Sequence, residues 1–207
     1  MKILLAGASG TIGGAIEKRL AVEHQVITAG YSHGNLRFDL ADSDSIRIMI
    51  DAVGEVDAII CAAGVTSFGP FEHLTEADYH QTLNSKLMGQ VNLLRIGRQA
   101  VRRGGSITLT SGFAAREPVP GCAAVAMANG ALESFVKAVA VELTEVRVNV
   151  VSPSFVTETM AMMGMGTSTS VSASLTAAVY EAALLGTMSG ETLQVAEYVN
   201  ADTHWVI

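Results

Sequence analysis

The sequence predicts a single α/β domain in which helices cover both faces of a mainly parallel, seven-stranded sheet. Short, continuous apolar runs alternate with helical patterns, as expected for strands that are buried on both faces. The connections between these segments are short, which favours right-handed crossovers within one sheet. The chain has 207 residues, enough for one sizeable core but few for two. We therefore expect one doubly wound domain over residues 1–207.

Each element follows from a local pattern. The apolar runs predict strands at Lys2–Ala6, Gln25–Ala29, Leu36–Phe38, Ala58–Cys61, Ser106–Thr110, Arg147–Val151 and Thr192–Ala196. Helical periodicity predicts helices at about residues 12–28, 43–53, 75–103, 123–145 and 173–185. The segment 160–174 is almost wholly Met, Gly, Ser, Thr and Ala, so it can bury little apolar surface. We expect it to be either a flexible flap over a pocket or a loose loop.

Composition and charge narrow the class of protein. Hydrophobic residues make up 49% of the chain and charged residues 16%, which excludes global disorder. The formal net charge of −7 argues against a nucleic-acid partner, because such partners require a cationic surface. Four arginines gather near one expected helix end, where a solvated face is favoured over a binding patch: Arg95, Arg98, Arg102 and Arg103.

The cysteines and the apolar stretches predict a cytoplasmic protein. Cys61 and Cys122 show neither metal-ligand spacing nor a disulfide framework, which indicates a reducing compartment. The first apolar run is too short for a signal peptide, and polar residues interrupt the longer run at 123–143, so we expect no membrane partner. His73 and His80 have no evident third ligand, and we expect no metal site.

A glycine-rich segment lies directly after the first strand and opens the first helix. Glycine there allows a tight turn, close approach of a pyrophosphate, and close packing of the helix on the strand. The helix N-terminus adds free N–H groups and a partial positive charge. The alternative is a structural turn without a ligand. The pattern predicts a dinucleotide that contacts Gly7, Ser9, Gly10, Thr11, Ile12 and Gly13.

Two further strand ends extend the predicted cofactor site. Asp39 and Leu40 follow the third strand, where a carboxylate can accept a hydrogen bond from an adenine amino group. A turn or a helix cap explains Asp39 equally well. Ala62, Ala63 and Gly64 follow the fourth strand, where small residues allow the backbone to contact a ribose.

The end of the second strand bears on the choice between NAD and NADP. An acidic residue there would bond the ribose hydroxyls and select NAD, but no acid stands between Glu23 and Asp39. Its absence removes repulsion of a 2′-phosphate, which Ser32, His33 or Arg37 could contact. We expect NADP to be preferred over NAD.

With these residues the chain resembles the short-chain dehydrogenase/reductase family, whose members have a Rossmann fold. The resemblance covers nearly the whole chain. Its motifs are the glycine segment, Asp39, Cys61–Gly64 in place of the family's Asn-Asn-Ala-Gly, and Arg147–Pro153. It implies an NAD(P)-dependent oxidoreductase. It also implies a homo-dimer or homo-tetramer built on the helices at 75–103 and 123–145, whose small residues permit close approach: Gly89, Gly97, Ala124 and Ala128.

The resemblance breaks at the active site. The family's tyrosine falls on Val125 and the lysine four residues later falls on Asn129. The serine falls on Gly112, with Ser111 one residue before it, and the asparagine falls on Lys86. Valine has no proton to give, and a positioned acid is typically worth about two to four orders of magnitude in rate. The family's ordinary mechanism is therefore expected to be absent.

Three residues are left as catalytic candidates: Lys86, Asn129 and Ser111. In the family the groups at positions 86 and 129 lie close together, so we hypothesise that Lys86 reaches the nicotinamide-ribose side and hydrogen-bonds Asn129. The alternative is that Lys86 extends to solvent. Two functions stay open. One is an NADP(H)-dependent oxidoreductase acting on an unknown small molecule with a non-standard proton donor such as Lys86, water or the substrate. The other is a non-catalytic dinucleotide-binding sensor or regulatory or assembly partner.

Overall fold

Seven parallel strands form one sheet in the order β3-β2-β1-β4-β5-β6-β7. The computed structural model describes residues 1–201, with side chains up to Val199. The strands are β1 (Lys2–Ala6), β2 (Gln25–Gly30), β3 (Leu36–Arg37), β4 (Val56–Cys61), β5 (Val101–Thr110), β6 (Arg147–Ser152) and β7 (Thr192–Gln194). This order confirms the doubly wound α/β fold.

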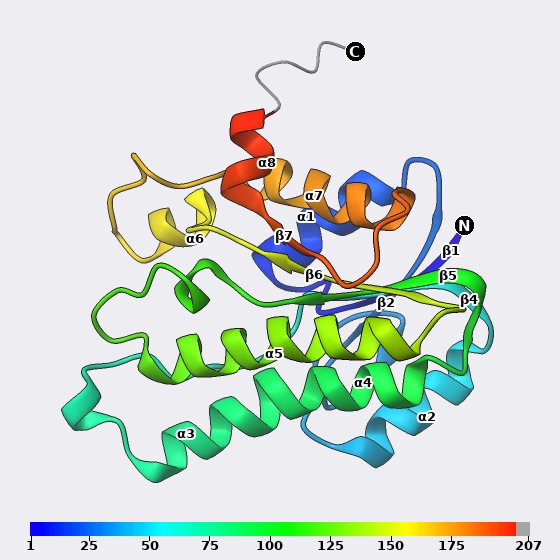
Figure 1. The fold of residues 1–207 in the computed structure, drawn as a ribbon, viewed down its shortest axis with the longest axis horizontal. Helices are drawn as coiled ribbons and strands as arrows, with labels where there is room; N and C mark the ends of the chain where they lie inside the picture. The colour runs from blue at the N-terminus through cyan, green and yellow to red at the C-terminus, as the bar shows by residue number, and fades with distance from the viewer. Residues whose placement is uncertain (202–207) are drawn as a thin grey trace.

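Helices cover both faces of the sheet (Figure 1). One face carries α2 (Ser43–Val53), α3 (Glu76–Thr82), the π-helical segment η2 (Leu83–Met88), α4 (Gly89–Gly97) and α5 (Ala123–Glu142). The other carries α1 (Thr11–Leu20), α7 (Ala173–Leu185) and α8 (Val195–Ala201), with α6 (Thr157–Met162) near one edge. Strand β1 contributes side chains to the hydrophobic cores on both faces of the sheet. Leu4 packs in the core under α2, α4 and α5, and Ile3 and Leu5 pack in the core under α1 and α7.

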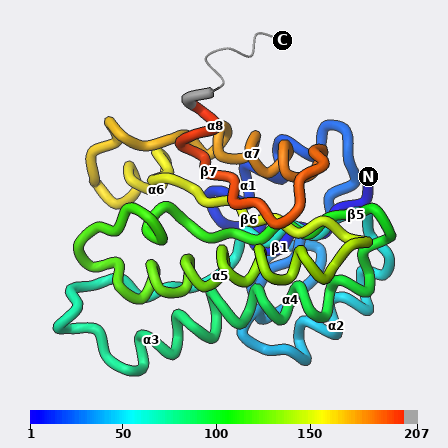
Figure 2. Tube along the Cα trace, in the orientation of Figure 1, coloured from blue at the N-terminus to red at the C-terminus, as the bar shows by residue number. Residues whose placement is uncertain are grey.

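The loops that follow the strands gather at one edge of the sheet, away from the N-terminus (Figure 2). Two of them contain short 3₁₀ turns, η1 (Phe71–His73) after β4 and η3 (Phe113–Ala115) after β5. The chain after β1 crosses to the α1 face and the chain after β4 to the α3 face. The two connections therefore part at this edge, which is where doubly wound sheets bind ligands.

Several element ends differ from the sequence prediction. Helix α1 ends at Leu20 instead of about residue 28, because the N–H groups of Glu23 and His24 both donate to the Leu20 carbonyl and close a turn before β2. The helical stretch expected up to 103 ends at Gly97, and β5 begins at Val101. Strand β7 ends at Gln194, where α8 takes over.

Because α4 ends at Gly97, the four arginines do not all lie at one helix end, but they stay on the surface. Arg102 and Arg103 lie on β5 instead of at a helix end. Arg102 pairs with Asp57 at 2.9 Å, and Arg103 pairs with Glu145 at 3.4 Å. Both guanidinium groups reach solvent, although Asp57 is largely buried, which agrees with a solvated face.

Helix α5 is the one helix among the described residues that is long and apolar enough to cross a membrane, by length and composition alone. Six of its residues are buried, and the helix packs against β6 and η3. A helix that covers a sheet passes the same test of length and composition, so this property carries little weight.

The segment 160–174 is partly ordered by backbone pairing. Helix α6 runs into its first residues and α7 begins at Ala173. Between them, the Val171 N–H donates to the Phe155 carbonyl at 2.8 Å, and the Thr157 N–H donates to the Val171 carbonyl at 3.0 Å. These two hydrogen bonds join the two ends of the segment to each other. Its role as a flap stays a prediction.

Candidate functional site

A groove of about 560 Å³ opens at the carboxyl edge of the sheet, beside the ends of β1 and β4. Eight of the predicted cofactor residues line it: Gly7, Ser9, Gly10, Asp39, Leu40, Ala62, Ala63 and Gly64. Gly30, Tyr31, Phe38, Ala41, Val65, Gln81 and Ser85 complete the lining. Residues from four separate strand ends therefore meet around one space.

The glycines of the β1–α1 turn have different tasks. Gly7 has φ +92°, and a Cβ there would lie 2.8 Å from the Ala62 carbonyl. A Cβ on Gly13 would lie 2.0 Å from the Gly7 carbonyl oxygen. Both positions thus need glycine so that the turn can pack. At Gly10 a Cβ would meet only the Gly7 oxygen, at 3.6 Å, among the described residues, so this glycine leaves the groove open.

The first turn of α1 begins beside the groove, at Gly10, although Thr11, Ile12 and Gly13 are not among the residues that line it. Among the described residues no side chain caps Gly10, and the first turn holds no acidic residue. The N–H groups of Thr11, Ile12 and Gly13 have no partner within the helix. The Ile12 side chain packs against the core, so only its backbone faces the turn. This arrangement suits an anionic group such as a phosphate.

The predicted residues at the adenosine end are only partly brought together. Asp39 lines the groove, and its Oδ1 also accepts a hydrogen bond from the Ala41 N–H at 2.9 Å. The residue therefore stabilises the local turn and is also part of the groove. Ser32 and His33 lie on the exposed turn after β2, outside the groove lining. Tyr31, which joins that turn to the groove, is 79% exposed.

Lys86 lies beneath the groove and is buried. Its Cδ is 2.8 Å from where a Cβ on Gly64 would stand, so the side chain passes under this lining residue. Its Nζ donates to the Ser111 carbonyl at 3.2 Å. Burial lowers the pKa of the Lys86 ammonium from its usual 10.5 to about 8, opposed in part by the nearby Cys61. The interpretation that Lys86 extends to solvent is wrong.

The predicted hydrogen bond between Lys86 and Asn129 is also wrong, since none joins them among the described residues. Instead the Asn129 Nδ2 donates to the Gly112 carbonyl at 3.4 Å, one residue along from the carbonyl that Lys86 reaches. The Asn129 Oδ1 is buried without a partner among the described residues. The two side chains thus share the end of β5 but are bonded to different carbonyls.

Two functional-site residues were missed by the sequence reasoning. The Ser111 hydroxyl donates to the Glu133 carboxylate at 2.8 Å, and Arg116 forms an ion pair with the same carboxylate. The Arg116 Nε also donates to the Gln194 side chain at 2.9 Å. The signal for Glu133 is its spacing: it stands four residues after Asn129 and therefore shares its helix face.

The backbone of this region is held by Gln90, which is fully buried. Its amide nitrogen donates to the carbonyls of Lys86 and Thr110 at 3.0 and 2.9 Å, and its Oε1 accepts from the Thr110 N–H at 2.8 Å. This side chain fastens the π-helical segment that carries Lys86 to the end of β5. The position of Lys86 is therefore fixed from both sides.

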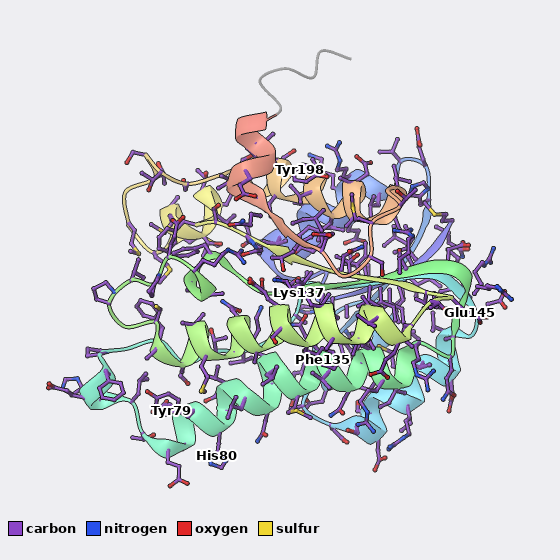
Figure 3. All side chains as sticks on the ribbon, in the orientation of Figure 1. Tyr79, His80, Phe135, Lys137, Glu145 and Tyr198 are labelled. Carbon is purple, nitrogen blue, oxygen red and sulfur yellow. The ribbon has the colours of Figure 1, made fainter. Side chains whose placement is uncertain are left out.

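Val125 lies on α5, and the described tyrosines lie on other parts of the chain. Tyr180 is fully buried on the α7 face, where its hydroxyl lies 2.7 Å from Thr110 Oγ1 and burial raises its pKa well above the usual range. Figure 3 shows Tyr79 on α3 and Tyr198 on α8, on opposite sides of the sheet. Tyr31 lines the groove, in the turn after β2.

The Cys61 thiol lies at the end of β4, near Lys86. Cys61 is fully buried, and burial raises the pKa of its thiol to about 11, so it stays protonated near neutrality. Among the described residues no group of three or more His, Cys, Asp or Glu side chains could hold a metal ion.

The small residues expected at a subunit interface serve the protomer's own core instead. A Cβ on Gly89 would lie 2.6 Å from Leu40, and one on Gly97 would lie 2.6 Å from Ile59. Ala124 and Ala128 are fully buried. Their size is explained by packing of α4 and α5 on the sheet, so they are not evidence for an interface.

The fold and the groove define a Rossmann domain, and comparison with known proteins gives its family. Residues 9–200 match the family model described as enoyl-(acyl carrier protein) reductase. The solved structure of protein lin1944 from Listeria innocua is 40% identical, with a TM-score of 0.91, over 94% of this chain and 99% of that one. A small-chain dehydrogenase in complex with NADPH is 27% identical, with a TM-score of 0.85, over 94% and 95% of the two chains.

A curated relative agrees with these matches. Carbonyl reductase [NADPH] 2 from Sus scrofa is 28% identical over 179 residues, which cover 77% of this chain and 73% of the relative. The chain belongs to the short-chain dehydrogenase/reductase family, a family of oxidoreductases.

Proposed function

We propose that the protein binds a nicotinamide dinucleotide in the groove at the carboxyl edge of the sheet. The observation that carries this proposal is the convergence of Gly10, Asp39 and Gly64 on one space of about 560 Å³. The uncapped start of α1 offers N–H groups for a diphosphate there. The open space at Gly10 leaves room for the phosphates to approach the backbone.

NADP is the proposed form of the cofactor, in preference to NAD. The turn after β2 carries exposed Ser32 and His33 and no carboxylate, which favours a 2′-phosphate over free ribose hydroxyls. Arg37, at the end of β3, is also exposed. It stands four residues after His33 and adds a positive charge to this region. Two relatives point the same way, since one is described in complex with NADPH and another is named for NADPH.

The reaction proposed is a reduction or oxidation without the family's usual tyrosine and lysine. When bound, the dinucleotide would supply or accept a hydride. The chain must then move a proton, and Lys86 Nζ is its candidate donor, because a pKa of about 8 lets it both hold and release a proton near neutrality. Ser111 is less suited, since its hydroxyl already donates to Glu133.

A second candidate function is a non-catalytic dinucleotide sensor or regulatory partner. Val125 stands on α5 where the family's proton donor falls, and the Lys86 Nζ is engaged by the Ser111 carbonyl. A site built this way can hold a cofactor without turning it over. The two functions share the groove and differ only at the reaction centre.

One pair of measurements separates them. NADPH and NADH fluorescence is titrated with the protein, and NADPH oxidation is then followed against a panel of carbonyl compounds. Binding with turnover that falls at least about a hundredfold in Lys86→Met supports the oxidoreductase. Lys137→Met, an exposed lysine on α5, is the control and should leave turnover unchanged. Tight binding without turnover supports the sensor, and no binding of either nucleotide overturns both.

Self-association is a separate proposal. Exposed apolar side chains lie on or beside α4 and α5, with Met88 42%, Met127 42% and Val141 80% exposed. They favour a homo-dimer or homo-tetramer that buries these helices. Light scattering that gives only the monomer mass at micromolar concentration would refute it.

A further inference from the structure

We propose that Gln90 is a positioning residue for the candidate reaction centre, whose amide holds the Lys86 ammonium against the Ser111 carbonyl. Gln90 is fully buried on α4, four residues after Lys86. It is not among the residues that line the groove, so it acts through Lys86. The inference rests on the proposed function, in which Lys86 supplies the proton.

The pairing of β4 with β5 stops before the end of β5, and the Gln90 side chain continues it. The last paired residues are Ile60 and Thr108. Two residues further on, the Thr110 N–H donates to the Gln90 Oε1 at 2.8 Å, and the Gln90 Nε2 donates to the Thr110 carbonyl at 2.9 Å. In a parallel sheet a neighbouring strand would bond the same two backbone groups. The amide therefore takes the place of a strand at this point.

The same amide also holds the segment that carries Lys86. Its Nε2 donates a second hydrogen bond, to the Lys86 carbonyl at 3.0 Å. Lys86 lies in the π-helical segment η2, after which the Gly89 N–H donates to the Asn84 carbonyl, five residues back instead of four. Such turns are rare and are frequent at functional sites. Gln90 thus stabilises an unusual backbone at the residue whose ammonium is the candidate proton donor.

Both ends of the contact between Lys86 and Ser111 are therefore held by one side chain. The Lys86 Nζ donates to the Ser111 carbonyl at 3.2 Å, and Ser111 directly follows Thr110. Both Nε2 protons and the Oε1 of Gln90 are engaged, so its amide has one orientation. Without these bonds the π-helical segment and the end of β5 can move apart, and water can reach the ammonium.

Three other titratable groups lie around this contact, from β4, α5 and α7. Burial raises the pKa of the Cys61 thiol to about 11 and that of the Tyr180 hydroxyl well above its usual range. Both are therefore neutral where Lys86 titrates, at a pKa of about 8. Glu133 accepts a hydrogen bond from the Ser111 hydroxyl and is paired with an arginine. A changed titration of Lys86 in a Gln90 variant thus reports the loss of the amide.

The test is a pH titration by NMR of the full chain labelled with ¹³C at the lysine ε-carbons. The chain has four lysines, and the signal missing in Lys86→Met belongs to Lys86. In wild type this signal should titrate near pH 8, well below the other three. Gln90→Met keeps the size of the side chain but lacks the amide. Its Lys86 midpoint should rise by about one pH unit or more, because hydration favours the charged ammonium.

The matched control is Asn149→Leu, which removes another fully buried amide. The Asn149 Nδ2 donates to the Met188 carbonyl at 2.8 Å, and its Oδ1 accepts from the Glu191 N–H at 3.1 Å. These bonds hold the loop before β7, and in the described part of the chain none joins Asn149 to Lys86. The control should lose stability without moving the Lys86 titration, which separates positioning from a general loss of packing.

Proton exchange in wild type gives a second reading that needs no folded variant. The side-chain amide protons of Gln90 should exchange about a hundredfold more slowly than those of the exposed Gln99, or slower still. Four results would overturn the assignment: rapid exchange at Gln90, a wild-type Lys86 that titrates with the other lysines, an unchanged Lys86 midpoint in folded Gln90→Met, or an equal rise in Asn149→Leu.

NADPH binding and turnover, measured on the same samples, separate this inference from the proposed function. The NMR titration needs neither cofactor nor substrate. A Lys86 midpoint that rises in Gln90→Met but not in Asn149→Leu, in a protein that does not turn NADPH over, leaves Gln90 as the residue that positions Lys86 and removes the oxidoreductase function.

Discussion

At the scale of single residues, the end of β5 concentrates charge in a buried place. Lys86 is 8% exposed and Glu133 is 8% exposed, yet they do not pair with each other. Glu133 is compensated by Arg116 and Ser111, whereas within the described part of the chain the Lys86 ammonium bonds only the Ser111 carbonyl. Burial disfavours the charged ammonium, so Lys86 gives up its proton more easily, which is the property that a proton donor near neutrality requires.

This burial makes the stability of the fold depend on pH. The folded pKa of Lys86, about 8, lies below the usual 10.5, so the unfolded chain binds more protons between these values. The free energy of unfolding of wild type should rise with pH across this window relative to Lys86→Met, by on the order of 3 kcal/mol in full. Urea unfolding at pH 7, 8, 9 and 9.5 measures it.

Two controls isolate the effect of Lys86. Taking the difference from Lys86→Met removes most of the contribution of Cys61, whose raised pKa of about 11 lowers stability over part of the same range. Lys137→Met, on the exposed face of α5, should show no such pH dependence. A pH-independent difference between wild type and Lys86→Met would mean that Lys86 is solvated.

The Arg116–Glu133 pair gives a second prediction at this scale. Arg116→Leu leaves the Glu133 carboxylate buried with only the Ser111 hydroxyl, and should destabilise the fold by about 2 kcal/mol. Arg116→Leu combined with Glu133→Gln should recover at least half of this loss, since no charge is then left unpaired. Thermal melts of the single and double variants measure the coupling; additive losses would contradict the pairing.

Sequence reasoning reached part of this site and missed the rest for a physical reason. Lys86, Asn129 and Ser111 were identified because the family resemblance gives positions for them. Arg116 lies in an irregular loop, and its contact with Glu133 spans 17 residues of sequence. No local period predicts such a contact, so only the folded chain reveals it.

At the scale of elements, α4 packs closely through two glycines, against the loop after β3 at Gly89 and against β4 and α2 at Gly97. A Cβ on Gly89 would lie 2.6 Å from the Leu40 side chain and 2.7 Å from its carbonyl oxygen. Gly89→Ala should therefore destabilise the fold by about 1–3 kcal/mol. Gly130→Ala in α5 is the matched control: among the described residues nothing lies within 4 Å of its Cβ, and it should stabilise by about 0.5–1 kcal/mol. Chemical denaturation distinguishes them; equal effects would contradict the packing.

The same scale shows why strands were easier to predict than element ends. Ile3, Leu4 and Leu5 are all fully buried, so a short apolar run in the sequence is enough to indicate a two-sided strand. Helix ends depend on hydrogen bonds that composition does not encode. The turn that stops α1 at Leu20 and the change from β7 to α8 at Val195 are of this kind.

At the scale of the whole molecule, the strand order places distant segments around one groove. Gly10, Asp39 and Gly64 follow three different strands and meet because β1 lies between β2 and β4. This meeting was predictable, since parallel strands end at one edge and sequential crossovers are right-handed. The contact between Phe113 and Phe155 was not predictable, because the two rings come from loops whose paths no pattern fixes.

The most direct measurement of dinucleotide binding in this groove is calorimetric titration of NADPH into wild type and Gly10→Val. A side chain at position 10 extends into the groove with little obstruction from the protein, so the variant should fold normally and bind NADPH at least tenfold more weakly. Gly130→Ala should bind like wild type. Undiminished NADPH binding by a folded Gly10→Val variant, or no binding by wild type, would contradict the proposed site.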